Sequence, residues 1–305
     1  MELFERLMPK RIKKILLTAS IYDSFLFADD EMLSEVLFEH NLTHKDHFVI
    51  TRAKNPTEAL ELLGKEDFDM VISMMQSVEF DMEEFVVKIK NLKNIPVVIL
   101  SFSMPDINLL TDKAKSVVDG VFLWQGDTKI FSSIINLIED RINLKHDLNY
   151  GVQCVLLVED NIRFYSMYLP IIYRELIKQM HLVMSDELNI SKKVLKMKAR
   201  PKIFLAQSYE QAWEIFEKYH NNLLGVITDV EYPIKEKTTE KAGLLLAVRV
   251  KKTLSDMPVL IQSSNQAYEP VALKLGASFL NKNSSDLSKQ IRGFIQRYFG
   301  FGDFV

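Results

Sequence analysis

The chain has 305 residues, 48% of them hydrophobic, and a formal net charge of −3. This length and composition predict a globular protein of two ordinary-sized domains, and the charge excludes a largely basic, nucleic-acid-binding surface. No apolar run approaches the ~18 residues that span a bilayer, and the basic start Pro9–Lys14 leads into a strand rather than a cleavage site. We therefore expect a cytoplasmic protein with no membrane partner, in which the single cysteine, Cys154, is a small buried residue.

Strand-like apolar runs alternate with helix-length segments along the chain, which is typical of parallel βα units. The first half contains five such runs, at 15–18, 48–51, 70–73, 97–100 and 120–123. The second half contains five more in matching order, at 155–158, 203–206, 224–228, 258–261 and 278–280. Helical periodicity follows several of the runs, as in 56–63 and its counterpart 209–216. The pattern predicts an internal duplication of one α/β design, each copy with a five-stranded parallel sheet.

The predicted domains are residues 10–147 and 152–299, separated after an amphipathic helix that runs from about 129 to 145. The second domain departs from the repeat at about 162–199, where a segment rich in Leu, Ile, Met, Lys and Glu predicts a helical insertion. Within it we expect Pro170 near a helix start or at a kink, and a break at 185–189 that caps a second helix.

Polar side chains stand at the ends of four second-domain strands. Glu159 and Asp160 follow the first of them, and Asp229 ends the third. Because the carboxyl ends of neighbouring parallel strands meet in one crevice, these carboxylates should form an acidic pocket beside Ser263 and Lys282. Three carboxylates there suggest Mg2+. The alternative, that the acidic pair only caps a helix, is weakened by the presence of Asp229 and Lys282.

The order and strand-end placement of these five residues resemble the receiver domain of two-component response regulators over residues 152–299. The resemblance implies a doubly wound, flavodoxin-like (βα)5 fold in each copy. It implies that Asp229 accepts a phosphoryl group from a histidine kinase or phosphotransfer protein, with Lys282 stabilising the transferring charge. Four groups would serve the Mg2+ ion: Glu159, Asp160, Asp229 and the backbone carbonyl of Glu231.

The same resemblance implies a switch. Ser263 would hydrogen-bond the new phosphoryl oxygen, and Phe279 would repack at the aromatic switch position. These two changes would alter an interface at about 265–285. Two departures from the family are Asn283, where proline is frequent, and the greatly lengthened first helix.

Alignment of the first domain on the second puts residues without metal or phosphoacceptor chemistry at the key positions: Ala19 and Ser20 at the acidic pair, Met74 at the phosphoacceptor and Gln125 at the lysine. Ser101 alone keeps its residue type. The first domain therefore resembles a pseudo-receiver, which favours a role in scaffolding, homodimerisation or partner docking.

We therefore predict a regulatory protein rather than an enzyme, at most with weak autophosphatase activity, that acts on an output protein or domain still to be identified. One alternative is a phosphorylation-independent scaffold, and another is a phosphatase-like hydrolase that uses Glu231 as its second acid or base. The lengthened helix, residues 199–203 and the aromatic tail 300–305 are similar to receiver regions ahead of phosphoenolpyruvate-synthase-like enzymes. That similarity implies a regulatory fragment whose chain continues into a further domain.

Overall fold

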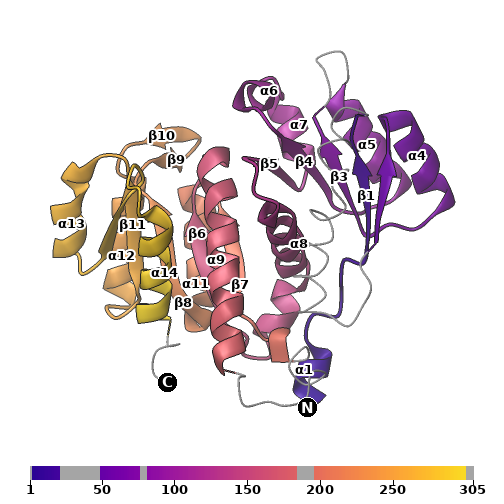
Figure 1. Cartoon of the computed structure of the whole chain (residues 1–305). Helices are drawn as coiled ribbons and strands as arrows, with labels where there is room; N and C mark the ends of the chain where they lie inside the picture. The colour runs from indigo at the N-terminus through magenta and orange to yellow at the C-terminus, as the bar shows by residue number, and fades with distance from the viewer. Residues whose placement is uncertain (1, 21–48, 76–80, 184–195, 300–305) are drawn as a thin grey trace. The chain divides into compact units, whose positions relative to one another are not determined.

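The computed structural model describes residues 2–20, 49–75, 81–183 and 196–299 (Figure 1). The chain divides into two compact units. The first unit is Lys10–Glu139, and the second unit is Met1–Pro9 together with Asp140–Val305. Helix α8 (Lys129–Leu148) contributes residues to both units.

The first unit is a five-stranded parallel sheet in the order β2-β1-β3-β4-β5. Its strands are β1 Lys14–Thr18, β2 Val49–Ala53, β3 Met70–Met74, β4 Val97–Ser101 and β5 Gly120–Leu123. Its helices, besides the first part of α8, are α4 Pro56–Lys65, α5 Met82–Leu92, α6 Met104–Asn108 and α7 Asp112–Val117. Local sequence fixes the helix starts: at α4, the Asn55 side chain accepts a hydrogen bond from the Glu58 amide, and Pro56 occupies the first turn.

The second unit repeats this sheet, with parallel strands in the order β7-β6-β8-β11-β12. Its strands are β6 Cys154–Val158, β7 Lys202–Ala206, β8 Leu223–Asp229, β11 Val259–Ser263 and β12 Ser278–Asn281. Its helices are α1 Glu2–Arg6, α9 Ile162–Val183, α11 Tyr209–Tyr219, η1 His220–Asn222, α12 Ala242–Thr253, η2 Gln266–Tyr268, α13 Glu269–Lys274 and α14 Leu287–Tyr298, in addition to the second part of α8.

Numbered within each unit, both sheets have the strand order 2-1-3-4-5, which is that of the doubly wound, flavodoxin-like fold. The predicted fold class is confirmed. All ten predicted strands are present, with ends within two residues of those expected.

The strand registers of the two units correspond towards the carboxyl ends of the strands, although the β6–β8 pair has a register shift between Cys154 and Val155. In the second unit Asp229 pairs with Gln262, and in the first unit Met74 pairs with Leu100. The alignment of Met74 with Asp229 therefore holds at the level of the backbone.

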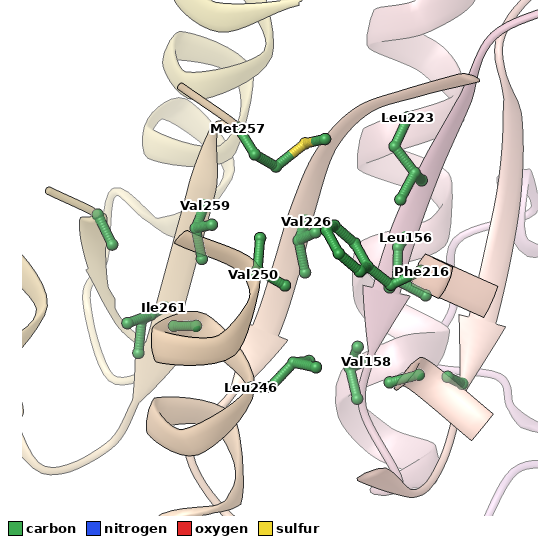
Figure 2. Close-up of a cluster of buried hydrophobic side chains, with 14 of the residues drawn as sticks. Leu156, Val158, Phe216, Leu223, Val226, Leu246, Val250, Met257, Val259 and Ile261 are labelled. Atoms are coloured by element: carbon green, nitrogen blue, oxygen red, sulfur yellow. The ribbon is translucent and has the colours of Figure 1, made fainter. Parts of the chain in front are cut away.

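An apolar core packs α11 and α12 against one face of the second sheet (Figure 2). Phe216 of α11 and Val250 of α12 lie in one buried cluster with the strand residues Leu156, Val226 and Ile261. Each such side chain contributes about 1.5–3 kcal/mol when fully buried. This packing holds β6, β8 and β11 side by side and so fixes where their carboxyl ends meet.

Helix α9 forms the first part of the predicted helical insertion. Pro170 lies inside this helix, and not near its start. The predicted break at 185–189 lies outside the described residues. Helix α9 runs beside α14 (Figure 1). The Gln296 side-chain amide of α14 donates a 2.7 Å hydrogen bond to Glu175 of α9.

A small antiparallel hairpin, β9 (Tyr232–Ile234) and β10 (Lys237–Thr239), follows β8 and was not predicted. Its turn residues, Lys235 and Glu236, have φ of 49° and 66°. Such hairpin turns normally carry glycine or asparagine, and the absence of both from this turn explains why the hairpin was not predicted.

A buried polar network ties the second part of α8 to the second unit. The Asp140 carboxylate accepts hydrogen bonds from the Tyr173 hydroxyl (2.8 Å), Arg200 Nη1 (3.0 Å) and the Ile203 amide (3.0 Å). The Lys202 ammonium lies 3.8 Å from Asp140 Oδ1. These contacts explain why the residues of α8 from Asp140 onward group with the second unit.

In the described part of the chain, no helix combines the length and the hydropathy of a bilayer-crossing segment.

Candidate functional site

Three carboxylates meet at the carboxyl edge of the second sheet. Glu159 and Asp160 directly follow β6, and Asp229 is the last residue of the neighbouring strand β8. One oxygen from each lies within 4.8 Å of the other two. Glu159 and Asp229 are buried, whereas Asp160 is half-buried at the pocket's rim. The strand order thus brings together the three residues that the sequence predicted.

Lys282 enters the same pocket from the end of β12. Its backbone amide donates a 2.9 Å hydrogen bond to the Ser263 carbonyl, which continues the β11–β12 ladder by one residue. This bond fixes the position of the Lys282 backbone, from which the side chain extends. Its Nζ lies 2.7 Å from Glu159 Oε2 and 2.7 Å from Asp229 Oδ2. The ring of Phe164, in the first turn of α9, lies 4.0 Å from the same Nζ, a cation–π distance.

With all three carboxylates ionised, the pocket would carry an excess of negative charge, because three carboxylates face one ammonium. Burial raises the pKa of Glu159 to about 8, and the neighbouring Asp229 charge adds to that rise while Lys282 opposes it. Burial likewise raises the pKa of Asp160 and of Asp229. An oxygen-only donor set with uncompensated negative charge fits a hard divalent cation.

The backbone around Asp229 is held tightly. The Val230 amide donates a 2.7 Å hydrogen bond to Asp229 Oδ1, and the Glu231 amide also donates to this carboxylate. The Thr228 hydroxyl donates to the Asp229 carbonyl oxygen (2.9 Å). A Cβ atom on Gly243, at the start of α12, would lie 1.7 Å from that carbonyl oxygen, so only glycine lets α12 begin here.

The other predicted site residues lie nearby or on the same strands. The Ser263 hydroxyl, at the end of β11, accepts a 3.1 Å hydrogen bond from the Asn265 amide. Phe279 is half-buried in β12 and packs against the core cluster of Figure 2. The Glu231 side chain is exposed beside the pocket.

Sequence analysis missed two residues that contact the pocket. Gln262, on β11, donates a 3.1 Å hydrogen bond from Nε2 to Glu159 Oε2. The other is Phe164, described above. Gln262 interrupts the apolar run 258–261 one position before Ser263, and this polar residue in a buried strand was the available signal.

The corresponding edge of the first unit has no carboxylate at the matching positions. Ala19 follows β1 and donates its amide to the Ala53 carbonyl, as Glu159 does to Ala206. Met74 ends β3 and is buried.

The residue in the lysine position is Trp124, and the alignment of Gln125 with Lys282 was wrong by one residue. The Trp124 amide donates to the Ser101 carbonyl (2.8 Å), which is the ladder contact that Lys282 makes in the second unit. The Trp124 ring packs against Phe102 and Phe131, with ring centroids 4.9 and 5.5 Å away.

No protein-family model and no curated protein matches the sequence. Similar solved structures include a two-component response regulator from Clostridium difficile, which is 20% identical, covers 43% of this chain and 98% of its own, and has a TM-score of 0.34. A response regulator from Thermotoga maritima in complex with Mg2+-BeF is 16% identical over 41% of this chain and 96% of its own, with a TM-score of 0.32. A phosphorylated response regulator from Burkholderia pseudomallei with calcium and citrate is 13% identical over 61% of this chain and 95% of its own, with a TM-score of 0.31.

With identities of 20% or less and TM-scores of 0.34 or less, these likenesses assign no function to the chain. The topology itself defines a flavodoxin-like α/β protein of two units, with the strand order that receiver domains share. Response-regulator receiver domains are among the solved structures to which it is similar.

Proposed function

We propose that the second unit is a receiver that accepts a phosphoryl group on Asp229 and thereby switches a protein-interaction surface. The observation that carries the proposal is the Asp229 carboxylate, held 2.7 Å from the Lys282 ammonium beside two further carboxylates at one sheet edge. The donor would be a phosphohistidine on a histidine kinase or phosphotransfer protein. The protein's role would be regulatory, in the cytoplasm.

The chemistry needs few groups from this chain. Asp160 and Asp229 would hold Mg2+, together with the Glu231 carbonyl and with Glu159 as a neighbouring charge. The ion, when bound, would supply positive charge against the phosphoryl oxygens. An Asp229 oxygen attacks phosphorus, a P–O bond forms as the P–N bond breaks, and the electron pair of that bond stays on the imidazole nitrogen. Lys282 would neutralise part of the charge on the transferring oxygens.

Ser263 and Phe279 would carry the response. The Ser263 hydroxyl would turn from the Asn265 amide to a phosphoryl oxygen and shift the loop after β11. Phe279 is half-buried, so its ring can pack further inward when that loop moves. The surface that changes would be the one formed by residues 265–285.

The first unit would serve as a docking or dimerisation domain. Its Ala19 and Met74 supply no oxygen ligand and no nucleophile at the matching strand ends. A scaffold role for this unit is compatible with phosphorylation of the other.

The test is Mg2+-dependent binding of beryllofluoride, an aspartyl-phosphate mimic, to the full chain by calorimetry. The wild type should bind with one-to-one stoichiometry, and Asp229→Asn should not. Asp256→Asn is the matched control, because Asp256 is an exposed aspartate of the same unit whose carboxylate accepts a hydrogen bond from the Ser255 hydroxyl. Absence of binding by a folded wild type would refute the proposal. Turnover of a phosphomonoester that depends on Asp229 would replace it with the hydrolase.

A further inference from the structure

Gln262 is fully buried, and the only hydrogen bond of its side-chain amide among the described residues is to Glu159 of the acidic pocket. Its Nε2 donates to Glu159 Oε2 at 3.1 Å, and its Oε1 has no partner in the described part of the chain. A buried, unpartnered carbonyl oxygen lowers stability. Gln262 is therefore poorly explained as a core residue, and its role should be sought in what its amide group does to Glu159.

The first unit provides an internal comparison. The residue that pairs with Met74 there is Leu100, in the place of Gln262 opposite Asp229. Leu100 is fully buried in the same strand. The fold thus accepts leucine at this position, and the unit that lacks the glutamate also lacks the amide.

Gln262 and Lys282 share one acceptor. Glu159 Oε2 receives the Gln262 amide at 3.1 Å and the Lys282 ammonium at 2.7 Å, while Glu159 Oε1 receives the Asn161 amide at 3.2 Å. If Lys282 moved away, Oε2 would keep a donor because of Gln262. Without Gln262, the departure of Lys282 would leave a buried carboxylate oxygen with no donor, which is strongly unfavourable.

A phosphoryl group on Asp229 would demand such a movement, since it brings new anionic oxygens next to Nζ. We propose, on the basis of the proposed function above, that Gln262 is a positioning residue that holds Glu159 and so allows Lys282 to move from Glu159 to the phosphoryl group. In this proposal Gln262 acts only through Glu159.

The experiment measures two affinities by calorimetry, that for Mg2+ alone and that for beryllofluoride in saturating Mg2+. In Gln262→Leu, beryllofluoride affinity should fall by about tenfold to a hundredfold, as expected for a lost hydrogen bond to a charged group, while Mg2+ affinity changes by less than about threefold. Gln262→Met, which is closer in shape to glutamine, should give the same result, a loss of beryllofluoride affinity with little change in Mg2+ affinity. Gln179→Leu is the matched control, because it also removes a buried amide that donates to a glutamate, Glu175, at 2.6 Å in the same unit.

A double-mutant cycle with Glu159→Gln tests the route of the effect. Replacing Gln262 should lose most of its effect on beryllofluoride once Glu159 is uncharged. Three outcomes would overturn the assignment while leaving the receiver chemistry intact. They are an unchanged beryllofluoride affinity in both Gln262 variants, equal losses of affinity for Mg2+ and beryllofluoride, and an effect of Gln262 that is undiminished in the Glu159→Gln background. Failure of the wild type to bind beryllofluoride would instead refute the proposed function, and with it this role.

Discussion

Replacing Asp140 by asparagine should strongly destabilise the second unit. Asp140 is fully buried and faces two cations, Arg200, whose Nη2 lies 2.9 Å from Oδ1, and Lys202. Asparagine removes the negative charge and turns an NH2 group toward donors that need an acceptor. Loss of one partner from a buried ion pair costs about 3–5 kcal/mol, because it leaves the other charge uncompensated.

Urea unfolding measures this loss. With a urea m-value of about 2 kcal/mol/M, the midpoint should fall by about 1.5–2.5 M. Of the chain's two tryptophans, Trp124 and Trp213, the second lies in α11, so a Trp124→Phe background makes fluorescence report on the second unit. The exposed control Asp256→Asn should change stability by no more than about 0.5 kcal/mol. A loss below about 1 kcal/mol for Asp140→Asn would show that the network does not anchor α8.

Three further predictions concern the same unit. Burial lowers the pKa of Lys202 from 10.5 to about 8, so the unfolded chain binds more protons than the folded chain between these two pH values. The free energy of unfolding should therefore rise by about 3 kcal/mol from pH 8 toward pH 10. Urea titrations at each pH should show this rise in the wild type and not in Lys202→Met. Lys282→Met should weaken beryllofluoride binding by at least about tenfold in calorimetry. The same variant should retain or strengthen Mg2+ binding, because a cation has left the pocket. Parallel losses of beryllofluoride and Mg2+ affinity would contradict this prediction. Gly243→Ala should lower the free energy of unfolding by about 3 kcal/mol, because the added Cβ meets the Asp229 carbonyl. The control Gly293→Ala, whose Cβ would have nothing within 4 Å, should be neutral or stabilising. Similar unfolding midpoints for the two variants would refute the steric argument.

The strands could be predicted from the sequence because each is a short apolar run between helix-length segments. The acidic pocket followed from them, since Glu159, Asp229 and Lys282 each stand at a strand's carboxyl end and the sheet topology brings such ends together. The β9–β10 hairpin could not be predicted, because its turn is built from Lys235 and Glu236 in backbone conformations that usually require glycine or asparagine.

Contacts between distant residues were also beyond the sequence. Asp140 and Arg200 are 60 residues apart, and no periodic pattern pairs them. The register error at Trp124 has a similar cause, because the position of a strand-end residue is decided by its ladder hydrogen bond to the neighbouring strand.

The two units together separate what the fold needs from what the site needs. In the first unit, Ala19, Met74 and Trp124 occupy the strand-end positions, Trp124 packs against aromatic rings, and the sheet has the same order and registers. The fold therefore does not require an acidic pocket. Burying Glu159 and Asp229 beside a third carboxylate with one ammonium opposes folding, as their raised pKa values indicate. Such a cost at a position where the fold tolerates apolar residues is a physical argument for a bound cation at this edge of the sheet, because the charge of a cation would compensate the carboxylates.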